Sequence, residues 1–209
     1  MDKTISNQDY KDIDSNNKLI LEELREYFKK HDTITIIGKG DTAQYKTDID
    51  AIGINQALIF TNCKFLFIND FESLFGIENL IKKIKYLFLP DFPHCKMTPL
   101  NNFTYKDVYA YINKYEFTGK FFVYQLHTTL NRQTQFKNIP FIPSAATTHT
   151  ATEFFSKLLN KKKFTFYGIN KTKLYHPDLK NLDFSHIKNN KEYRYLFDAV
   201  ITIFNNNMV

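Results

Sequence analysis

The stretch Thr33-Ile34-Thr35-Ile36-Ile37, followed directly by Gly38-Lys39-Gly40-Asp41-Thr42, decides the fold. Five residues rich in β-branched side chains predict a buried strand, and the two glycines predict a tight turn after it. Short apolar runs recur along the chain and are expected to be further strands, over 51–54, 64–68, 86–89, 120–126 and 164–167. Segments with helical spacing separate them, over about 74–83, 103–115, 144–160 and 190–204.

Short apolar strands that alternate with helices are typical of α/β proteins with a mainly parallel sheet and helices on both faces. The length of 209 residues fits one domain. We therefore expect a single Rossmann-like domain over residues 17–209. The polar residues 1–16 are expected to be a loose N-terminal lead-in, and Asp14-Ser15 to cap a first helix over about 17–30.

The composition narrows the class of partner. The net charge of +6 fits an anionic ligand. The lysines are spread out rather than gathered in a basic arm, so we expect no nucleic-acid partner; peripheral contact with a membrane and a homo-oligomer stay open. No apolar run reaches about 18 residues, and the polar N-terminus has no signal-peptide pattern, so we expect a cytoplasmic protein without a transmembrane segment. Cys63 and Cys95 lack metal or redox spacing, and Cys63 is expected in the core.

In a parallel α/β sheet, ligands bind beyond the carboxyl ends of the strands, so the residues that end each strand are the candidates. Gly38 and Gly40 let the backbone approach a phosphate, with Thr42 beside them; the alternative is an ordinary tight turn. The amides of Asn55 and Gln56 suit a base, a ribose or a sugar hydroxyl, although Asn55 also suits a helix cap.

Four further positions are candidates of the same kind. Asp70 follows the third strand and has the same two interpretations as Asn55. Ser144 opens a helix, where a phosphate or carboxylate can meet free N–H groups, or where the serine simply caps the helix. Gly168 ends the last strand. His186 lies in a polar loop and titrates near neutrality, which suits a general base as well as a solvated surface histidine.

These pieces, in this order, resemble the bacterial sialyltransferases of the Campylobacter lipooligosaccharide type. That family has a Gly-x-Gly-Pro-Ser turn after its first strand, where this chain has Gly38-Lys39-Gly40-Asp41-Thr42. Its Asn-Gln pair contacts the donor nucleotide, and Asn55-Gln56 matches it. Its Thr-Ser-Gly helix start places a serine near the donor phosphate, and Pro143-Ser144-Ala145 is similar.

The resemblance continues towards the C-terminus. Gly168-Ile169-Asn170 is similar to a Gly-Ile-Asp strand end, with Asn170 in place of the aspartate. His186-Ile187-Lys188-Asn189 is similar to the His-x-Lys-Asn segment that supplies the catalytic base. The stretch between Gly168 and His186 is shorter than the family's lid, and only Tyr175 is placed to contact the leaving phosphate.

The resemblance implies an inverting glycosyltransferase that uses a CMP-sugar donor and a glycan acceptor. His186 would be the base, Tyr175 would contact the leaving phosphate, and no cofactor or metal would be required. Two alternatives stay open. One is a nucleotide-binding module without activity. The other is a nucleotide-dependent diphosphokinase. This alternative is considered because archaeal pterin diphosphokinases share the glycine turn and the Asn-Gln pair, and in it Asp70 would hold Mg²⁺.

Overall fold

A computed structural model describes residues 5–40, 49–95, 98–99, 103–126, 136–142 and 146–169. Its α-helices are α1 (Asn7–Phe28), α2 (Tyr105–Ile112) and α3 (Thr147–Leu158). The strands are β1 (Thr33–Ile37), β2 (Ile52–Ile54), β3 (Phe65–Phe67), β4 (Tyr86–Pro90), β5 (His94–Cys95), β6 (Thr98–Pro99), β7 (Lys120–Tyr124) and β8 (Lys163–Tyr167). Short 3-10 helices complete these elements: η2 (Asn55–Ile59), η3 (Phe71–Leu74), η4 (Glu78–Lys83) and η5 (Asn113–Tyr115).

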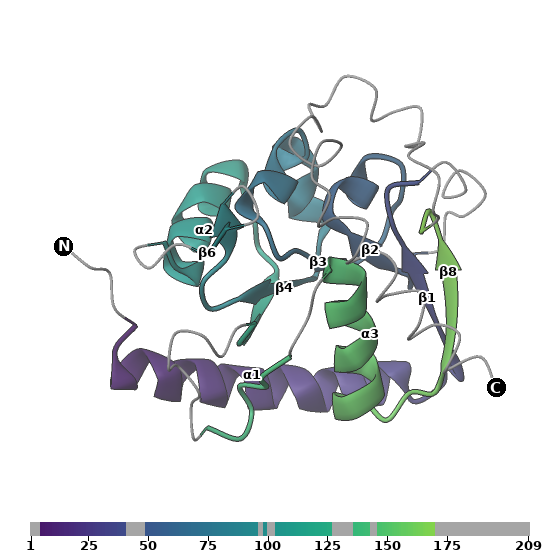
Figure 1. The fold of residues 1–209 in the computed structure, drawn as a ribbon, viewed down its shortest axis with the longest axis horizontal. Coiled ribbons are helices and arrows are strands. Elements are labelled where there is room, and N and C mark those ends of the chain that lie inside the picture. The colour runs from purple at the N-terminus through teal and green to yellow at the C-terminus, as the bar shows by residue number, and fades with distance from the viewer. Residues whose placement is uncertain are drawn as a thin grey trace.

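Six strands form one sheet in the order β7-β4-β3-β2-β1-β8, and every neighbouring pair is parallel (Figure 1). The expected single Rossmann-like α/β domain is therefore confirmed in its fold class. The chain adds β2, β3, β4 and β7 on one side of β1 and then places β8 on the other side. Such a reversal is the point at which open parallel sheets bind their ligands.

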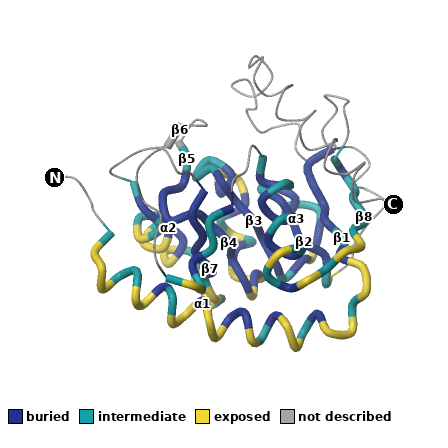
Figure 2. Tube along the Cα trace, turned by 60° about the horizontal axis from the view of Figure 1, so that its bottom comes forward, coloured by how far each residue is buried: buried dark blue, intermediate teal, exposed yellow. Residues whose placement is uncertain are grey.

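Helices cover both faces of the sheet, as expected. One face packs against α1 and α3, through Leu24 and Phe28 of α1 and Phe154 and Phe155 of α3. The other face packs against α2 and the 3-10 segments that follow β2 and β3. In Figure 2 the central strands β2, β3 and β4 are buried along their whole length, the edge strand β8 is only partly buried, and α1 alternates between buried and exposed residues. This pattern fits strands that carry continuous apolar runs and a helix with one apolar side.

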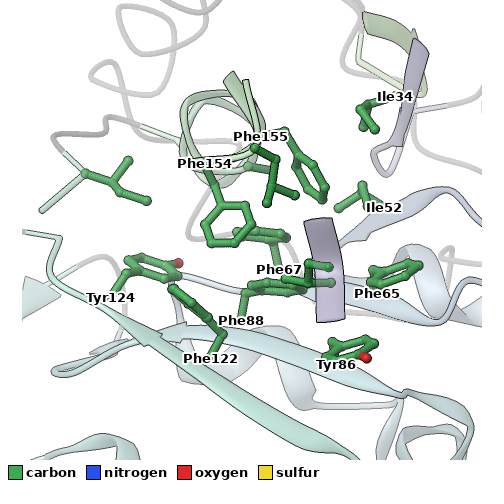
Figure 3. Close-up of a cluster of buried hydrophobic side chains, with 14 of the residues drawn as sticks. Ile34, Ile52, Phe65, Phe67, Tyr86, Phe88, Phe122, Tyr124, Phe154 and Phe155 are labelled. Atoms are coloured by element: carbon green, nitrogen blue, oxygen red, sulfur yellow. The ribbon is translucent and has the colours of Figure 1, made fainter. Parts of the chain in front are cut away.

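Aromatic side chains dominate the core below α3 (Figure 3). Parallel register places Phe67 of β3 opposite Phe88 of β4, and their rings stack with centroids 4.1 Å apart. Phe154 of α3 meets the Phe88 ring edge to face at 5.0 Å. Each such side chain contributes about 1.5–3 kcal/mol by burial, so this cluster joins the central strands to α3.

The N-terminal helix differs from the prediction. It begins at Asn7 rather than near residue 17, so most of the expected lead-in is helical. Its cap is a reciprocal pair in which Ser6 Oγ accepts from the Asp9 N–H and the Asp9 carboxylate accepts from the Ser6 N–H, rather than Asp14-Ser15. The polar residues of this segment face solvent or, like Asn17, bond to the edge strand; the Asn17 amide donates to the Val123 carbonyl at 2.7 Å.

The segment expected as a helix over 74–83 is two short 3-10 helices, η3 and η4. Gly76 separates them with a φ of 82°, a left-handed conformation that ends regular helix. Cys63 is fully buried, as expected. None of the helices within the described ranges combines the length and apolar character needed to cross a membrane. The expected helix over 190–204 lies outside the described residues.

Candidate functional site

Because the six strands are parallel, their carboxyl ends meet at one end of the sheet, here called the carboxyl end. Five of the predicted site residues lie there. Gly38 and Gly40 follow β1, Asn55 and Gln56 follow β2, and Gly168 follows β8. Their strands are neighbours in the order β2-β1-β8, so the structure brings these residues together at the reversal point of the sheet. Thr42, Ser144, Asn170, Tyr175 and His186 lie outside the described residues.

The glycine turn is explained by close packing of β1 against β8. The Gly38 N–H donates to the Tyr167 carbonyl at 2.7 Å, and the Gly40 N–H donates to the Gly168 carbonyl at 2.8 Å. A Cβ atom on Gly38 would lie 2.6 Å from the Gly168 carbonyl oxygen, which only glycine avoids. These two N–H groups therefore bond to the end of β8, and the tight-turn alternative accounts for the glycine at position 38.

Asn55 does not act as the helix cap that its position suggested. It has a left-handed φ of 55°, and η2 has no side-chain cap. Its Oδ1 atom is buried, and no donor of the described residues lies within hydrogen-bonding distance of it. A buried acceptor without a donor costs about 1–3 kcal/mol, so this side chain is oriented for something other than local stability.

Gln56 shows the same feature more strongly. Its side chain is buried, with 6% of its surface exposed. Its Nε2 donates to the Glu72 carbonyl at 3.1 Å, which fixes the amide, whereas Oε1 has no donor within the described ranges. The end of β2 thus holds two adjacent amide oxygens that need donors. Ribose hydroxyls, sugar hydroxyls and amino groups of bases supply such donors.

Asp70, at the end of β3, faces His94 of β5. The His94 backbone N–H donates to the Asn69 carbonyl at 2.9 Å, which holds the two segments side by side. The Asp70 Oδ1 and His94 Nδ1 atoms lie 3.5 Å apart, an ion pair when the imidazole is protonated. Although Asp70 stands at the N-cap position of η3, its carboxylate forms no capping hydrogen bond, so the cap interpretation is wrong here too.

Lys39, between the two glycines, is a buried cation at the same end of the sheet. Only 9% of its surface is exposed. Burial lowers the pKa of the Lys39 ammonium to about 8, and the negative charge of Asp70 opposes this shift. Lys39 follows β1, Asn55 and Gln56 follow β2, and Asp70 comes after β3, so these residues lie at the carboxyl ends of three neighbouring strands.

The first turn of α3 lies against the end of β3. The Asn69 Nδ2 donates to Thr150 Oγ1 at 3.2 Å, and the Tyr124 hydroxyl donates to Asn69 Oδ1 at 2.7 Å. This fully bonded Asn69 contrasts with the unsatisfied amides of the β2 end. The bond between Asn69 and Thr150 also places the start of α3, three residues after the predicted site residue Ser144 in the sequence, close to the carboxyl end of the sheet.

Sequence reasoning missed Lys39 and gave His94 no role. A lysine directly after a buried strand and flanked by glycines was a usable signal for Lys39, because a side chain in so tight a turn has few routes to solvent. No sequence pattern marked His94, which reaches Asp70 only through strand β5. Asp50 pairs with Lys64 at the opposite end of the sheet, at 3.6 Å.

Comparison of the chain with protein families, curated proteins and solved structures gave no match. Function therefore has to be argued from the site itself. Within the part of the chain that the structure describes, no group of three or more His, Cys, Asp or Glu side chains could hold a metal ion. What this end of the sheet offers is two amide acceptors, one buried ammonium group and one Asp–His pair.

Proposed function

We propose that the protein binds a CMP-activated sugar at the carboxyl end of its sheet and transfers the sugar to a glycan acceptor. The observation that carries the proposal is the pair of buried amide oxygens on Asn55 and Gln56, which lack donors among the described residues. A cytidine ring offers an amino group and a ribose offers hydroxyl groups, so this ligand supplies donors of the required kind.

The position of the pair supports the same proposal. Asn55 and Gln56 follow β2, next to the strand at which the sheet reverses its order. They are also the residues that match the donor-contacting pair of the sialyltransferase family that the sequence resembles. In the proposed reaction, His186 takes the proton from the acceptor hydroxyl, the hydroxyl oxygen bonds to the sugar carbon, and CMP leaves. Tyr175 donates a hydrogen bond to the departing phosphate.

Titration calorimetry with CMP, CMP-sialic acid and ATP, each with and without Mg²⁺, tests the binding step. We expect both cytidine ligands to bind without metal and ATP to bind at least about ten times more weakly, since a site that bonds a specific base edge rejects a base that leaves its groups unpaired. Binding of ATP alone, and only with Mg²⁺, would overturn the proposal in favour of a diphosphokinase.

The transfer step is tested by CMP release in the presence of galactosyl and sialyl acceptors. His186→Ala is expected to lower kcat by roughly two to four powers of ten and to leave the affinity for CMP unchanged, because the base contacts the acceptor. His31→Ala is a matched control, since His31 lies between α1 and β1 at the opposite end of the sheet. A wild-type protein that binds CMP but releases none from CMP-sialic acid would instead be a binding module.

A further inference from the structure

The amino end of the sheet, where its six parallel strands begin, gathers lysines that the proposed function does not use. Among the described residues, every strand of this sheet except β2 has a lysine at its start or just before it. The backbone holds three of them in a row across β3, β4 and β7. The Lys85 N–H donates to the Lys64 carbonyl at 2.9 Å, and the Lys120 N–H donates to the Lys85 carbonyl at 2.8 Å.

The far side of this end carries a second group of lysines, at the start of β8. The Lys161 ammonium group donates to the His31 carbonyl at 2.6 Å and to the Phe28 carbonyl, which fixes residues 161–163 beside the C-terminal end of α1 and its residues Lys29 and Lys30. Since neighbouring strands lie about 4.8 Å apart, the two groups span a surface of roughly 20 Å from β4 to β8.

Much of the positive charge at this end is not neutralised. Carboxylates lie within ion-pair distance of Lys29, Lys64, Lys82 and Lys120. Further lysines of the strand starts are exposed and have no ion pair with any described residue: Lys30, Lys83, Lys85, Lys162 and Lys163. In the same segments Asp32 is the exposed acid that likewise has no such pair, so positive charge is in excess.

An apolar side chain lies between the two groups of lysines. Ile49, just before β2, is 49% exposed, and its carbonyl accepts from the Lys64 N–H at 3.2 Å. A half-exposed isoleucine among lysines is the composition of a surface that lies on a bilayer, with the apolar group inserted and the charges at the headgroups. Nucleic-acid surfaces more often use arginine and exposed aromatic rings. The large aromatic side chains exposed in the described ranges, Phe75 and Tyr109, lie on η3 and α2 instead.

We propose that the amino end of the sheet docks on a membrane of anionic lipids, which the unpaired lysines attract and into which Ile49 inserts. This surface lies opposite Asn55 and Gln56, so docking leaves the carboxyl end of the sheet facing away from the bilayer. The proposal goes beyond the proposed function and does not depend on it.

Co-sedimentation of the full chain with vesicles tests the docking. We expect binding to phosphatidylcholine vesicles that contain about one third phosphatidylserine, and not to phosphatidylcholine alone. Binding should weaken as NaCl rises from about 0.1 M to 1 M, because the screening length shortens from about 10 Å to about 3 Å. The double variant Lys83→Gln/Lys162→Gln should bind roughly 25 times more weakly, since each lysine near an anionic surface contributes about fivefold.

Lys11→Gln/Lys137→Gln is the matched control, because it removes the same charge from two exposed lysines near the carboxyl end. Lys11 follows Tyr10, whose hydroxyl donates to Asp91 just after β4, and Lys137 follows Phe136, whose ring stacks on Tyr10. This variant should bind anionic vesicles within about twofold of wild type.

Ile49→Ser tests the apolar contact and should weaken vesicle binding about fivefold, with Phe75→Ser as a control that keeps it. Equal binding to neutral vesicles, or equal losses in the two double variants, would overturn the proposal. So would lysine-dependent binding of RNA without binding of vesicles, which would make this end a nucleic-acid surface. CMP affinity should be the same in all these variants, so a failure of docking leaves the proposed function standing, and a protein that docks without binding CMP would refute only that function.

Discussion

The two ends of the parallel sheet differ in how far their buried polar side chains are paired. At the amino end, where the strands begin, helix α1 supplies partners. Its Tyr27 hydroxyl bonds to Asp50, which also contacts Lys64 at 3.6 Å, and its Glu23 accepts from the Tyr86 hydroxyl at 2.7 Å. At the carboxyl end, Asn55 and Gln56 hold buried oxygens without donors among the described residues.

The difference shows where the chain gives up stability. Paired polar groups at the amino end each contribute a little, whereas every unsatisfied oxygen at the carboxyl end costs about 1–3 kcal/mol. The buried Lys39 adds a further cost there, because burial disfavours its charged form. Such costs are tolerated at sites that bind ligands, which supports the proposal that the ligand binds at the carboxyl end of the sheet.

The largest expected effect compares two crowded glycines, one at each end. Gly38→Ala would place a Cβ 2.6 Å from the Gly168 carbonyl oxygen, and Gly119→Ala would place one 2.5 Å from the Ile84 carbonyl oxygen. Each should lower the free energy of unfolding by about 3 kcal/mol, the upper part of the range for overpacking, in urea denaturation. Only Gly38→Ala should also weaken CMP binding, because it displaces the end of β1, which neighbours the strand end that carries Asn55 and Gln56.

Equal loss of CMP affinity in both glycine variants would break the comparison, since it would mean that general destabilisation, rather than the position of the turn, decides binding. Both affinities are to be measured at 15 °C, well below the unfolding temperature of the variants. Circular dichroism at the same temperature checks that each variant is folded.

The second effect is a gain in stability with pH at the carboxyl end. The pKa of Lys39 is lowered to about 8 in the folded state, so between pH 8 and 10 the unfolded chain binds more protons and the folded state becomes relatively more stable. We expect about 2 kcal/mol of this gain between pH 7 and 9.5. Lys39→Met should be more stable than wild type at pH 7, and this difference should shrink by about 2 kcal/mol by pH 9.5.

This rise in stability with pH is expected to end near pH 10, because buried tyrosines begin to titrate in the unfolded chain. Burial raises the pKa of Tyr105 to about 12 and raises that of Tyr124 further. A raised folded pKa stabilises the protein below the unfolded value of about 10 and is lost as the pH rises above it. Stability should therefore fall beyond pH 10 in wild type and Lys39→Met alike. Urea denaturation at intervals of half a pH unit measures both the rise and the fall in stability. If the free energies of unfolding of wild type and Lys39→Met ran parallel from pH 7 to 9.5, the lowered pKa of Lys39 would be contradicted.

The fold was predictable because its strands are continuous apolar runs. Thr33–Ile37, for example, reads as a buried strand without knowledge of its neighbours. The start of α1 was not, since Asn17 lies in a polar stretch and is nevertheless fully buried, with its amide bonded to β7, 106 residues away. A polar residue buried through long-range hydrogen bonds carries no local signal.

The candidate site, like the fold, was predictable from the sequence only in part. Asn55 and Gln56 were predictable as strand-end residues. Which of their amide atoms have hydrogen-bond partners depends on distant residues such as Glu72, which only the folded chain brings near. The two glycines were predictable as a turn, but the partner of their N–H groups is the end of β8, more than 120 residues further along. Strand order, which no local pattern contains, decides both outcomes.

The third effect isolates one unsatisfied oxygen. Asn55 and Asn160 both have left-handed backbone, with φ of 55° and 52°, but Asn160 is exposed and lies before β8 at the amino end. Glycine accepts this conformation, so Asn→Gly removes each side chain with little strain. Asn55→Gly should weaken CMP binding about tenfold, about 1.4 kcal/mol, and change stability by less than about 1 kcal/mol. Asn160→Gly should not change the affinity; loss of affinity in both would refute the assignment.

The smallest expected effect is a loss of stability on removing one partly exposed carboxylate at the amino end of the sheet. Glu23 is partly exposed and accepts hydrogen bonds from Lys120 and Tyr86, which lower the pKa of its carboxyl group, Lys120 most. Exposed pairs contribute about 0.2–1 kcal/mol, so Glu23→Gln should lower the free energy of unfolding at pH 7 by about 0.5 kcal/mol.

The pH dependence of this small loss separates a paired carboxylate from a packing role. A carboxyl group with a lowered folded pKa stabilises the protein above its unfolded value of about 4.5 and loses that contribution as the pH falls. The difference between wild type and Glu23→Gln should therefore shrink as the pH falls below about 4.5, and it should also shrink in 1 M NaCl, where charges are screened over about 3 Å. CMP affinity should not change. A loss of several kcal/mol, or one that persists at pH 3, would mean that Glu23 is needed for packing. The polar contacts at the amino end would then not be weak, and the comparison with the unsatisfied oxygens at the carboxyl end would fail.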